Sequence, residues 1–211
     1  PCFEGATLSC GMAGQDGAID TVSPDPERGL SFTTIGDAPA RGLCGSGVLD
    51  ALALLLDAGI VDETGRLEAD ASPLGARITD DALTFTDSVR FTQKDIREVQ
   101  LAKAAVAAGI RVLLQQRGLT PEQLDGVYLA GGFGSYLDPE SAAAIGMLPR
   151  ACAGKLHTLG NTALAGAAVL TLDGAQWQRI RSISRVCSYL ELSGRADFAA
   201  AFTENLSFPQ P

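Results

Sequence analysis

One stretch of the sequence combines the residue types and the spacing that are suited to holding a nucleotide. Residues 127–130 form a short apolar run, and Gly131, Gly132 and Gly134 follow it directly. This pattern predicts a buried strand that ends in a turn with little side-chain bulk, against which a ligand can lie. Asp138 and the proline after it then predict the start of a helix, because both residues favour first helical positions. A tight strand-to-helix connection would use the same residues, so the pattern leaves both interpretations open.

A second candidate site lies at the start of an earlier helix. Gly45, Ser46 and Gly47 precede apolar residues that recur at intervals of three and four up to Gly59. This period predicts a buried helix that Gly59 ends. The unpaired amides of a first helical turn and the positive end of the helix dipole attract phosphate, and the two glycines would allow close approach. Ser46 is equally suited to be the cap of the helix, and both readings stay open.

The longest helix is predicted over residues 93–117. Its apolar residues keep a helical period, Thr92 and Asp95 resemble a capping box, and Gly118 is placed to end the helix. Lys103 falls on the apolar line of this helix. We expect its ammonium group to extend to the edge of the core, and an acidic partner or a ligand is the alternative.

Strands and shorter helices alternate over the second half of the chain, which favours an α/β layer structure. Strands or hairpins are predicted at residues 30–35, 83–91, 127–130, 156–159 and 188–192. Helices are predicted at residues 139–145, 163–172 and 195–205. The second of these is rich in Ala and Gly, a content that permits close packing on a sheet. His157 lies in a strand pattern with no recognisable catalytic partner beside it, so a structural role is expected.

The composition excludes several functional classes. The chain has 211 residues, 46% of them hydrophobic and 19% charged, and a net charge of -9. We therefore expect a soluble protein that does not bind nucleic acid and does not cross a membrane, because it has no basic cluster and no apolar run of about 20 residues. The five cysteines are widely spaced without a C-x-x-C pair, which predicts reduced thiols in a cytoplasmic protein. Because the sequence begins without Met, a fragment of a longer protein is expected.

Four motifs in a fixed order resemble a known family. They are residues 3–6, 44–47, 91–105 and 129–142. Together they are similar to the C-terminal ATPase domain of the reductive activators of corrinoid-dependent enzymes, and the resemblance runs along nearly the whole chain. It implies the fold of actin, heat-shock chaperones and sugar kinases, in which residues 1–211 form a single domain, the second lobe, with a mixed sheet flanked by helices.

The resemblance also implies a function and a set of ligands. The family uses ATP, with Mg²⁺, to drive the electron transfer that returns an inactive Co(II) corrinoid protein to Co(I). The adenosine side of the site would be Gly131, Gly132, Phe133 and Gly134. The phosphate side would be Gly45, Ser46 and Gly47, with weaker candidates in Gln93 and Lys94.

Other parts of the activator are expected outside this sequence. The first lobe, the catalytic residues and a ferredoxin-like domain with a [2Fe-2S] cluster would precede Pro1, so hydrolysis by this piece alone should be negligible. A corrinoid protein is the expected partner and a homodimer the expected assembly. The alternative function is a non-catalytic dimerisation or docking module. A Rossmann-type dinucleotide site is disfavoured, because the glycines at 131–134 do not have the G-x-G-x-x-G spacing.

Overall fold

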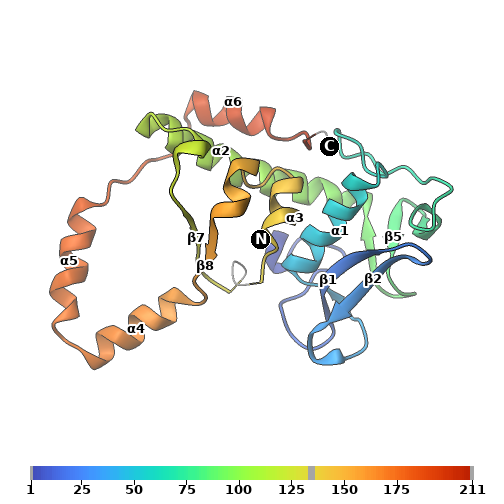
Figure 1. Cartoon of the computed structure of the whole chain (residues 1–211), viewed down its shortest axis with the longest axis horizontal. Coiled ribbons are helices and arrows are strands. Elements are labelled where there is room, and N and C mark those ends of the chain that lie inside the picture. The colour runs from blue at the N-terminus through green and yellow to red at the C-terminus, as the bar shows by residue number, and fades with distance from the viewer. Residues whose placement is uncertain (1, 133–135, 210–211) are drawn as a thin grey trace.

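Helix α1 (Gly45–Asp57) packs on one of three small sheets, and the longest helix, α2 (Gln93–Arg117), contacts the last strand of another (Figure 1). The computed structural model describes residues 2–132 and 136–209. The strands within these residues are β1 (Ala18–Asp25), β2 (Gly29–Thr34), β3 (Gly42–Leu43), β4 (Ile78–Thr79), β5 (Ala82–Thr84), β6 (Arg90–Thr92), β7 (Val127–Leu129) and β8 (Leu156–Thr158). The α-helices are α1 (Gly45–Asp57), α2 (Gln93–Arg117), α3 (Pro139–Ala144), α4 (Thr162–Leu172), α5 (Gln176–Val186) and α6 (Ala196–Glu204). Short 3-10 turns are η1 (Cys2–Glu4), η2 (Ile35–Asp37), η3 (Gly75–Arg77), η4 (Pro121–Gln123) and η5 (Arg150–Lys155).

The described strands form three small sheets, and the first of them is mixed, as predicted. In the first sheet β1 pairs with β2 antiparallel and with β3 parallel. The second sheet is the antiparallel meander β4-β5-β6, and the third is the parallel pair β7 and β8. The predicted hairpins at residues 30–35 and 83–91 are therefore confirmed. The strand predicted at residues 188–192 is wrong, because its alternating side chains have no neighbouring strand to pair with and the backbone there is irregular.

Helix α1 forms the centre of the hydrophobic core. Val48, Leu49, Leu52 and Leu55 are fully buried, and the helix packs on β1, η1 and α3. Gly59 follows the helix with a φ of 68°, a conformation that costs glycine little. The predicted helix and its end are confirmed.

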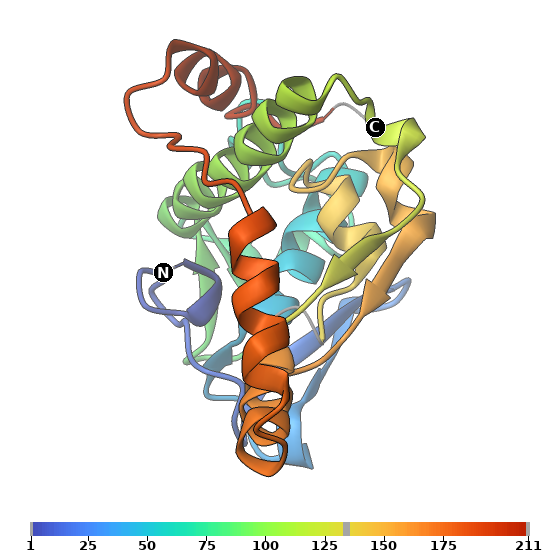
Figure 2. The same cartoon turned by 90° about the vertical axis from the view of Figure 1, so that its left-hand side faces the viewer.

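Helix α2 has the predicted ends. The side chain of Thr92 accepts a hydrogen bond from the amide of Asp95, the carboxylate of Asp95 accepts one from the amide of Thr92, and Gly118 ends the helix in the left-handed conformation. Helix α6 lies along α2 (Figure 2). The apolar period and both end signals agree, which explains why the limits of this helix could be predicted closely.

The expectation that Lys103 reaches solvent is wrong. Its side chain is 1% exposed, because residues 206–208 cross α2 above it. The ammonium group donates a hydrogen bond to the carbonyl of Ser207 and lies 4.9 Å from the ring centroid of Phe208. Burial lowers the pKa of Lys103 from 10.5 to about 8, since a low-dielectric environment disfavours the charged form.

Helices α4 and α5 project away from the sheets (Figure 1). Every residue of α4 except the half-buried Leu170 is exposed, so this helix does not make the close sheet packing that its composition permits. Its composition allows close packing, but no described part of the chain covers it. Strand β7 is also less buried than predicted, because Tyr128 is exposed and its two neighbours are half-buried. None of the described helices is long and apolar enough to span a membrane.

Candidate functional site

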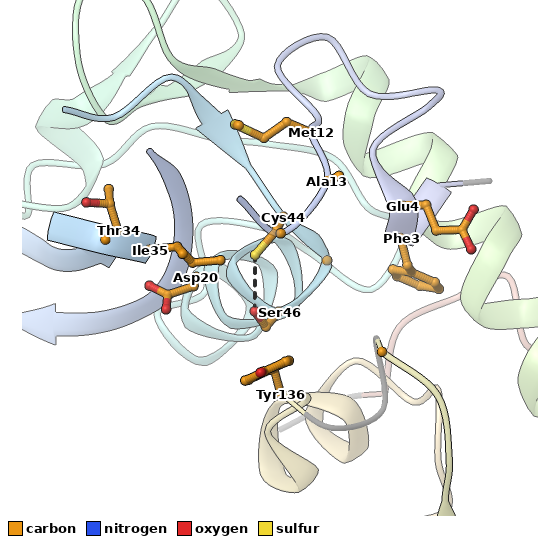
Figure 3. A pocket seen from close by; sticks show the side chains of 14 residues that line it. Phe3, Glu4, Met12, Ala13, Asp20, Thr34, Ile35, Cys44, Ser46 and Tyr136 are labelled. Carbon is orange, nitrogen blue, oxygen red and sulfur yellow. Dashed lines mark hydrogen bonds between the residues drawn. The ribbon is translucent and has the colours of Figure 1, made fainter. Parts of the chain in front are cut away.

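A pocket of about 650 Å³ lies where η1, the β1–β2 hairpin, the start of α1 and the glycine turn after β7 meet (Figure 3). Phe3 and Glu4 lie on one side of the start of α1, and Asp20 and Thr34 lie on the other. The described residues that line the pocket are Phe3, Glu4, Met12, Ala13, Gly14, Asp20, Thr34, Ile35, Gly36, Cys44, Gly45, Ser46, Gly132 and Tyr136. The two stretches that the sequence singles out, at 45–47 and at 131–134, therefore contribute to one cavity.

The first turn of α1 gives the pocket amide groups. Cys44 is the N-cap residue, and Gly45 and Ser46 are the first two helical residues. Amides at these positions have no acceptor within the helix, and the helix dipole adds positive potential. The reading of Ser46 as the cap is wrong, because its hydroxyl contacts the Sγ of Cys44 at 3.3 Å (Figure 3) and makes no capping hydrogen bond. Together these groups form a surface that is suited to an anion.

Gly47 has a packing role. A Cβ atom added here would lie 2.2 Å from the carbonyl oxygen of Ile19 in β1, closer than any side chain allows. Gly47 does not line the pocket. It allows the start of α1 to lie directly against β1, which holds the amides of Gly45 and Ser46 in position.

The glycine turn forms the facing wall. Gly131 has a φ of 101°, and its amide donates to the carbonyl of Gly160 at 2.8 Å. Gly132 lines the pocket, and a Cβ atom added to it would meet nothing within 4 Å. The space beside Gly132 is thus open to a ligand. Phe133 and Gly134 lie outside the described residues.

Gln93 and Lys94 lie elsewhere. The side-chain amide of Gln93 donates to the carbonyl of Gly65 at 2.7 Å and accepts from the amide of Leu67 at 2.8 Å. This pair of bonds fixes the turn at residues 62–67 to the start of α2. Lys94 is exposed, and neither residue lines the pocket. The structure does not bring these two weaker candidates to the site.

The charge of the pocket comes from acidic residues. Asp20 and Glu4 line it, and the described lining residues include neither Lys nor Arg. The carboxylate of Asp20 accepts a hydrogen bond from the hydroxyl of Thr33 at 2.7 Å. Positive potential for a phosphate must therefore come from backbone amides and from any cation that arrives with the ligand.

Several lining residues were missed as site residues. Phe3, Met12, Ile35 and Tyr136 add apolar surface from four segments that are far apart in the sequence. Phe3 and Tyr136 belong to two of the four recognised motifs, so a signal existed for them. For Met12 and Ile35 no local pattern indicates a shared cavity, because only the fold brings them together.

The cysteines and His157 do not form a metal site in the described part of the chain. No three His, Cys, Asp or Glu side chains there are grouped to hold a metal ion. Cys2, Cys10, Cys44, Cys152 and Cys187 are free thiols, and burial raises the pKa of Cys2 to about 11. His157 stacks on Tyr128 with their ring centroids 5.1 Å apart, an arrangement that fits the structural role expected for it.

Comparison with known proteins gives consistent matches over the whole chain. Residues 1–211 match the sequence family described as the C-terminal domain of RACo, the ASKHA domain. The corrinoid activation enzyme RamQ of Eubacterium limosum is 32% identical, with 99% of this chain and 38% of that protein covered. A Co(II) methylated amine-specific corrinoid protein reductase of Methanosarcina barkeri is 28% identical, with 88% of this chain and 36% of that protein covered.

A solved structure gives the same result. The reductive activator for corrinoid, iron-sulfur protein matches all of this chain with a TM-score of 0.88 and 35% identity, over 35% of its own length. The predicted fold is confirmed. The chain spans a little over a third of the length of the proteins it matches.

Proposed function

Since this chain belongs to the family of C-terminal ASKHA domains of reductive corrinoid activators, we propose that its pocket binds ATP as half of a nucleotide cleft. The observation that supports this most directly is the meeting of Gly45, Ser46 and Gly132 in one cavity. A helix N-terminus that faces a side-chain-free turn has the features that phosphate and a flat base require.

Different residues of the pocket would contact different parts of the nucleotide. The amides of Gly45 and Ser46 hold phosphate oxygens, and the bare backbone at Gly131 and Gly132 lies beside the adenosine. The apolar surface of Tyr136 at the edge of the turn excludes water from the base. Phe133 and Gly134, which lie outside the described residues, stay candidates for contact with the nucleotide. Gly47 contributes by letting α1 approach β1.

A Mg²⁺ ion would be held chiefly by the phosphates of the nucleotide. Mg²⁺ commonly keeps several waters and binds phosphates with only one or two carboxylates. The carboxylates of Asp20 and Glu4 border the pocket and can accept hydrogen bonds from such waters. When bound, the ion would neutralise phosphate charge in a pocket that has no cationic side chain among its described lining residues.

We extend this proposal to the full-length protein. Two of the related proteins are named for the activation or reduction of corrinoid proteins and a third for the reductive activation of a corrinoid, iron-sulfur protein. By analogy, the full-length protein would use ATP to return a Co(II) corrinoid protein to Co(I), with electrons from a [2Fe-2S] cluster in another domain. Its partner would be the corrinoid protein of a methyltransferase system in the cytoplasm, and a homodimer is the proposed assembly.

Calorimetric titration of the full-length protein with ATP and Mg²⁺ tests the site. Gly132→Asp places a carboxylate in the open space next to the proposed nucleotide and should weaken binding at least tenfold, about 1.4 kcal/mol. Gly174→Asp is the matched control, because Gly174 is exposed, lies between α4 and α5 and has equally open space around it. Equal affinities of the wild type and of both variants would show that the glycine turn is not the adenosine site.

The exposed faces of α4 and α5 favour a second candidate function, a docking or dimerisation module. Large apolar side chains are exposed along both helices, namely Leu164, Val169, Leu172, Trp177, Ile180, Ile183 and Val186. Light scattering of this chain over a hundredfold concentration range would show a rising mass if these faces pair with a second copy. A constant monomer mass would indicate that these faces pack against another part of the full-length protein and not against a second copy.

A further inference from the structure

A buried carboxyl group joins the two walls of the pocket. Asp50 lies on α1, one turn beyond the residues that line the pocket, and is 8% exposed. Its Oδ2 accepts a hydrogen bond from the amide of Val22 in β1 at 3.2 Å, and its Oδ1 lies 2.8 Å from the hydroxyl of Ser141 in α3. Asp50 thus connects α1, whose start faces the ligand, with α3, which follows the glycine turn.

The same hydroxyl also contacts a second carboxylate. Ser141 Oγ lies 2.9 Å from Oδ2 of Asp138, the N-cap residue of α3, which also accepts from the amide of Ser141 at 2.9 Å. A serine hydroxyl has one proton to donate. With both carboxylates ionised, only one of the two contacts of Ser141 Oγ can be a hydrogen bond. One additional proton on Asp50 satisfies both: Asp50 donates to Ser141, and Ser141 donates to Asp138.

The surroundings of Asp50 favour the protonated form of its carboxyl group. Burial raises the pKa of the Asp50 carboxyl, and the negative charges of Asp138 and Asp20 act in the same direction, against hydrogen bonds from Ser141 and Val22 that lower it. Asp20 lies on β1 and lines the pocket. The elements packed against α1 are β1, β3, η1 and α3. Their described titratable groups are Asp20, Asp25, Cys2, Glu4 and Glu140, with Asp138 at the cap of α3.

We propose that Asp50 is a positioning residue whose protonated carboxyl holds the phosphate wall and the adenosine wall of the pocket together through Ser141 and Asp138. The inference rests on the proposed function, because it assigns the two walls to one nucleotide. A raised pKa in the folded protein means that the stabilising contribution of this group is fully present below its ordinary pKa of 3.8 and is lost as the pH rises through the raised value. ATP affinity should therefore fall as Asp50 loses its proton.

The test is the ATP affinity of the full-length protein over a pH series, for the wild type, Asp50→Asn and Ser141→Ala. The amide of Asn can donate to Ser141 and accept from Val22 at every pH, so this variant reproduces the protonated state. The affinity ratio of Asp50→Asn to wild type cancels the titration of ATP itself. This ratio should be near one at low pH and rise about tenfold at high pH. The wild type then loses one hydrogen bond that the Asn variant keeps, and a hydrogen bond to a charged group contributes about this much. Ser141→Ala should bind weakly throughout the series.

Infrared spectroscopy gives a readout that does not depend on nucleotide. The wild type should show the C=O stretch of a protonated, buried carboxyl group, and this band should disappear in Asp50→Asn and titrate with the fall in affinity. If no ATP binds to the wild type at any pH, the proposed function fails, but the infrared band still shows whether Asp50 is protonated. A pH-independent affinity ratio, or a spectrum in which Asp50→Asn removes no protonated carboxyl, would overturn the inference.

Discussion

Helices α5 and α6 have similar lengths, yet only α6 lies against the rest of the domain. Ala201 of α6 is buried against α2, and Arg111 of α2 pairs with Glu204 of α6. On α5, Trp177 is 53% exposed, and the two isoleucines that follow it on the same face are also exposed. Both helices have an apolar face. The difference teaches that this pattern predicts a helix and a need for cover, but not which part of the protein supplies the cover.

The largest change in the free energy of unfolding is expected at residues 206–208, which follow α6 and pack on α2. Phe208 is buried, its amide donates to the carbonyl of Glu63, and its ring lies under the ammonium group of Lys103. Phe208→Ala should lower the free energy of unfolding by about 3–5 kcal/mol, because it leaves a cavity. Urea unfolding measures this. A loss below 1 kcal/mol would show that residues 206–208 are not packed on α2 in solution.

A slightly smaller effect is expected from Lys103, and its size depends on pH. Because burial lowers its pKa to about 8 in the folded protein, the unfolded chain binds more protons between about pH 8 and 10.5. The unfolding free energy should therefore rise over this range by up to about 3 kcal/mol from this group. Lys103→Met should remove that rise, and the difference between the two pH profiles isolates it from other titrating groups. Parallel profiles would contradict the burial of the ammonium group.

The ion pair between α2 and α6 should contribute less. Arg111 and Glu204 are both substantially exposed, so solvent screens their attraction. A double-mutant cycle with Arg111→Ala and Glu204→Ala should give a coupling free energy of about 0.2–1 kcal/mol. A coupling above 2 kcal/mol would mean that charge, and not the apolar contact, holds α6 in place.

The smallest effect is expected on α5. Trp177→Gln should change the unfolding free energy of this chain by no more than about 0.5 kcal/mol, as is usual for an exposed residue. The same substitution should destabilise the full-length protein more if the rest of that protein covers α5. Chemical unfolding of this chain and of the full-length protein measures the two changes. Equal changes in unfolding free energy would show that this face of α5 is exposed in the full-length protein as well.

The sequence predicted those elements whose signals are local. Residues 93–117 have a capping box, an apolar period and a terminal glycine, and α2 has these limits. The start of α1 and the turn at Gly132 were likewise singled out, and they meet in one pocket. Whether these residues bind a nucleotide stays a prediction that the calorimetric experiment addresses.

The remaining errors have tertiary causes. Lys103 was expected to reach solvent, since nothing on its own helix shows that residues 206–208 cover it. Asp50 drew no attention, because a single acid on an apolar helix usually faces water, whereas here three elements enclose it. Helix α5 was missed, because its N-cap residue is Ala175, which has no side chain that can cap a helix. Gln93 was placed near phosphate by resemblance, but its amide is used by the turn at residues 62–67.

The hydrogen bond between Gly131 and Gly160 has a mechanical consequence. Helix α4 begins two residues after Gly160, and its 11 residues extend for about 16 Å at 1.5 Å per residue. A tilt of about 10° at its first turn would therefore carry its far end through about 3 Å. A displacement of the far end of α4 would therefore be transmitted through Gly160 to the backbone of the glycine turn at Gly131.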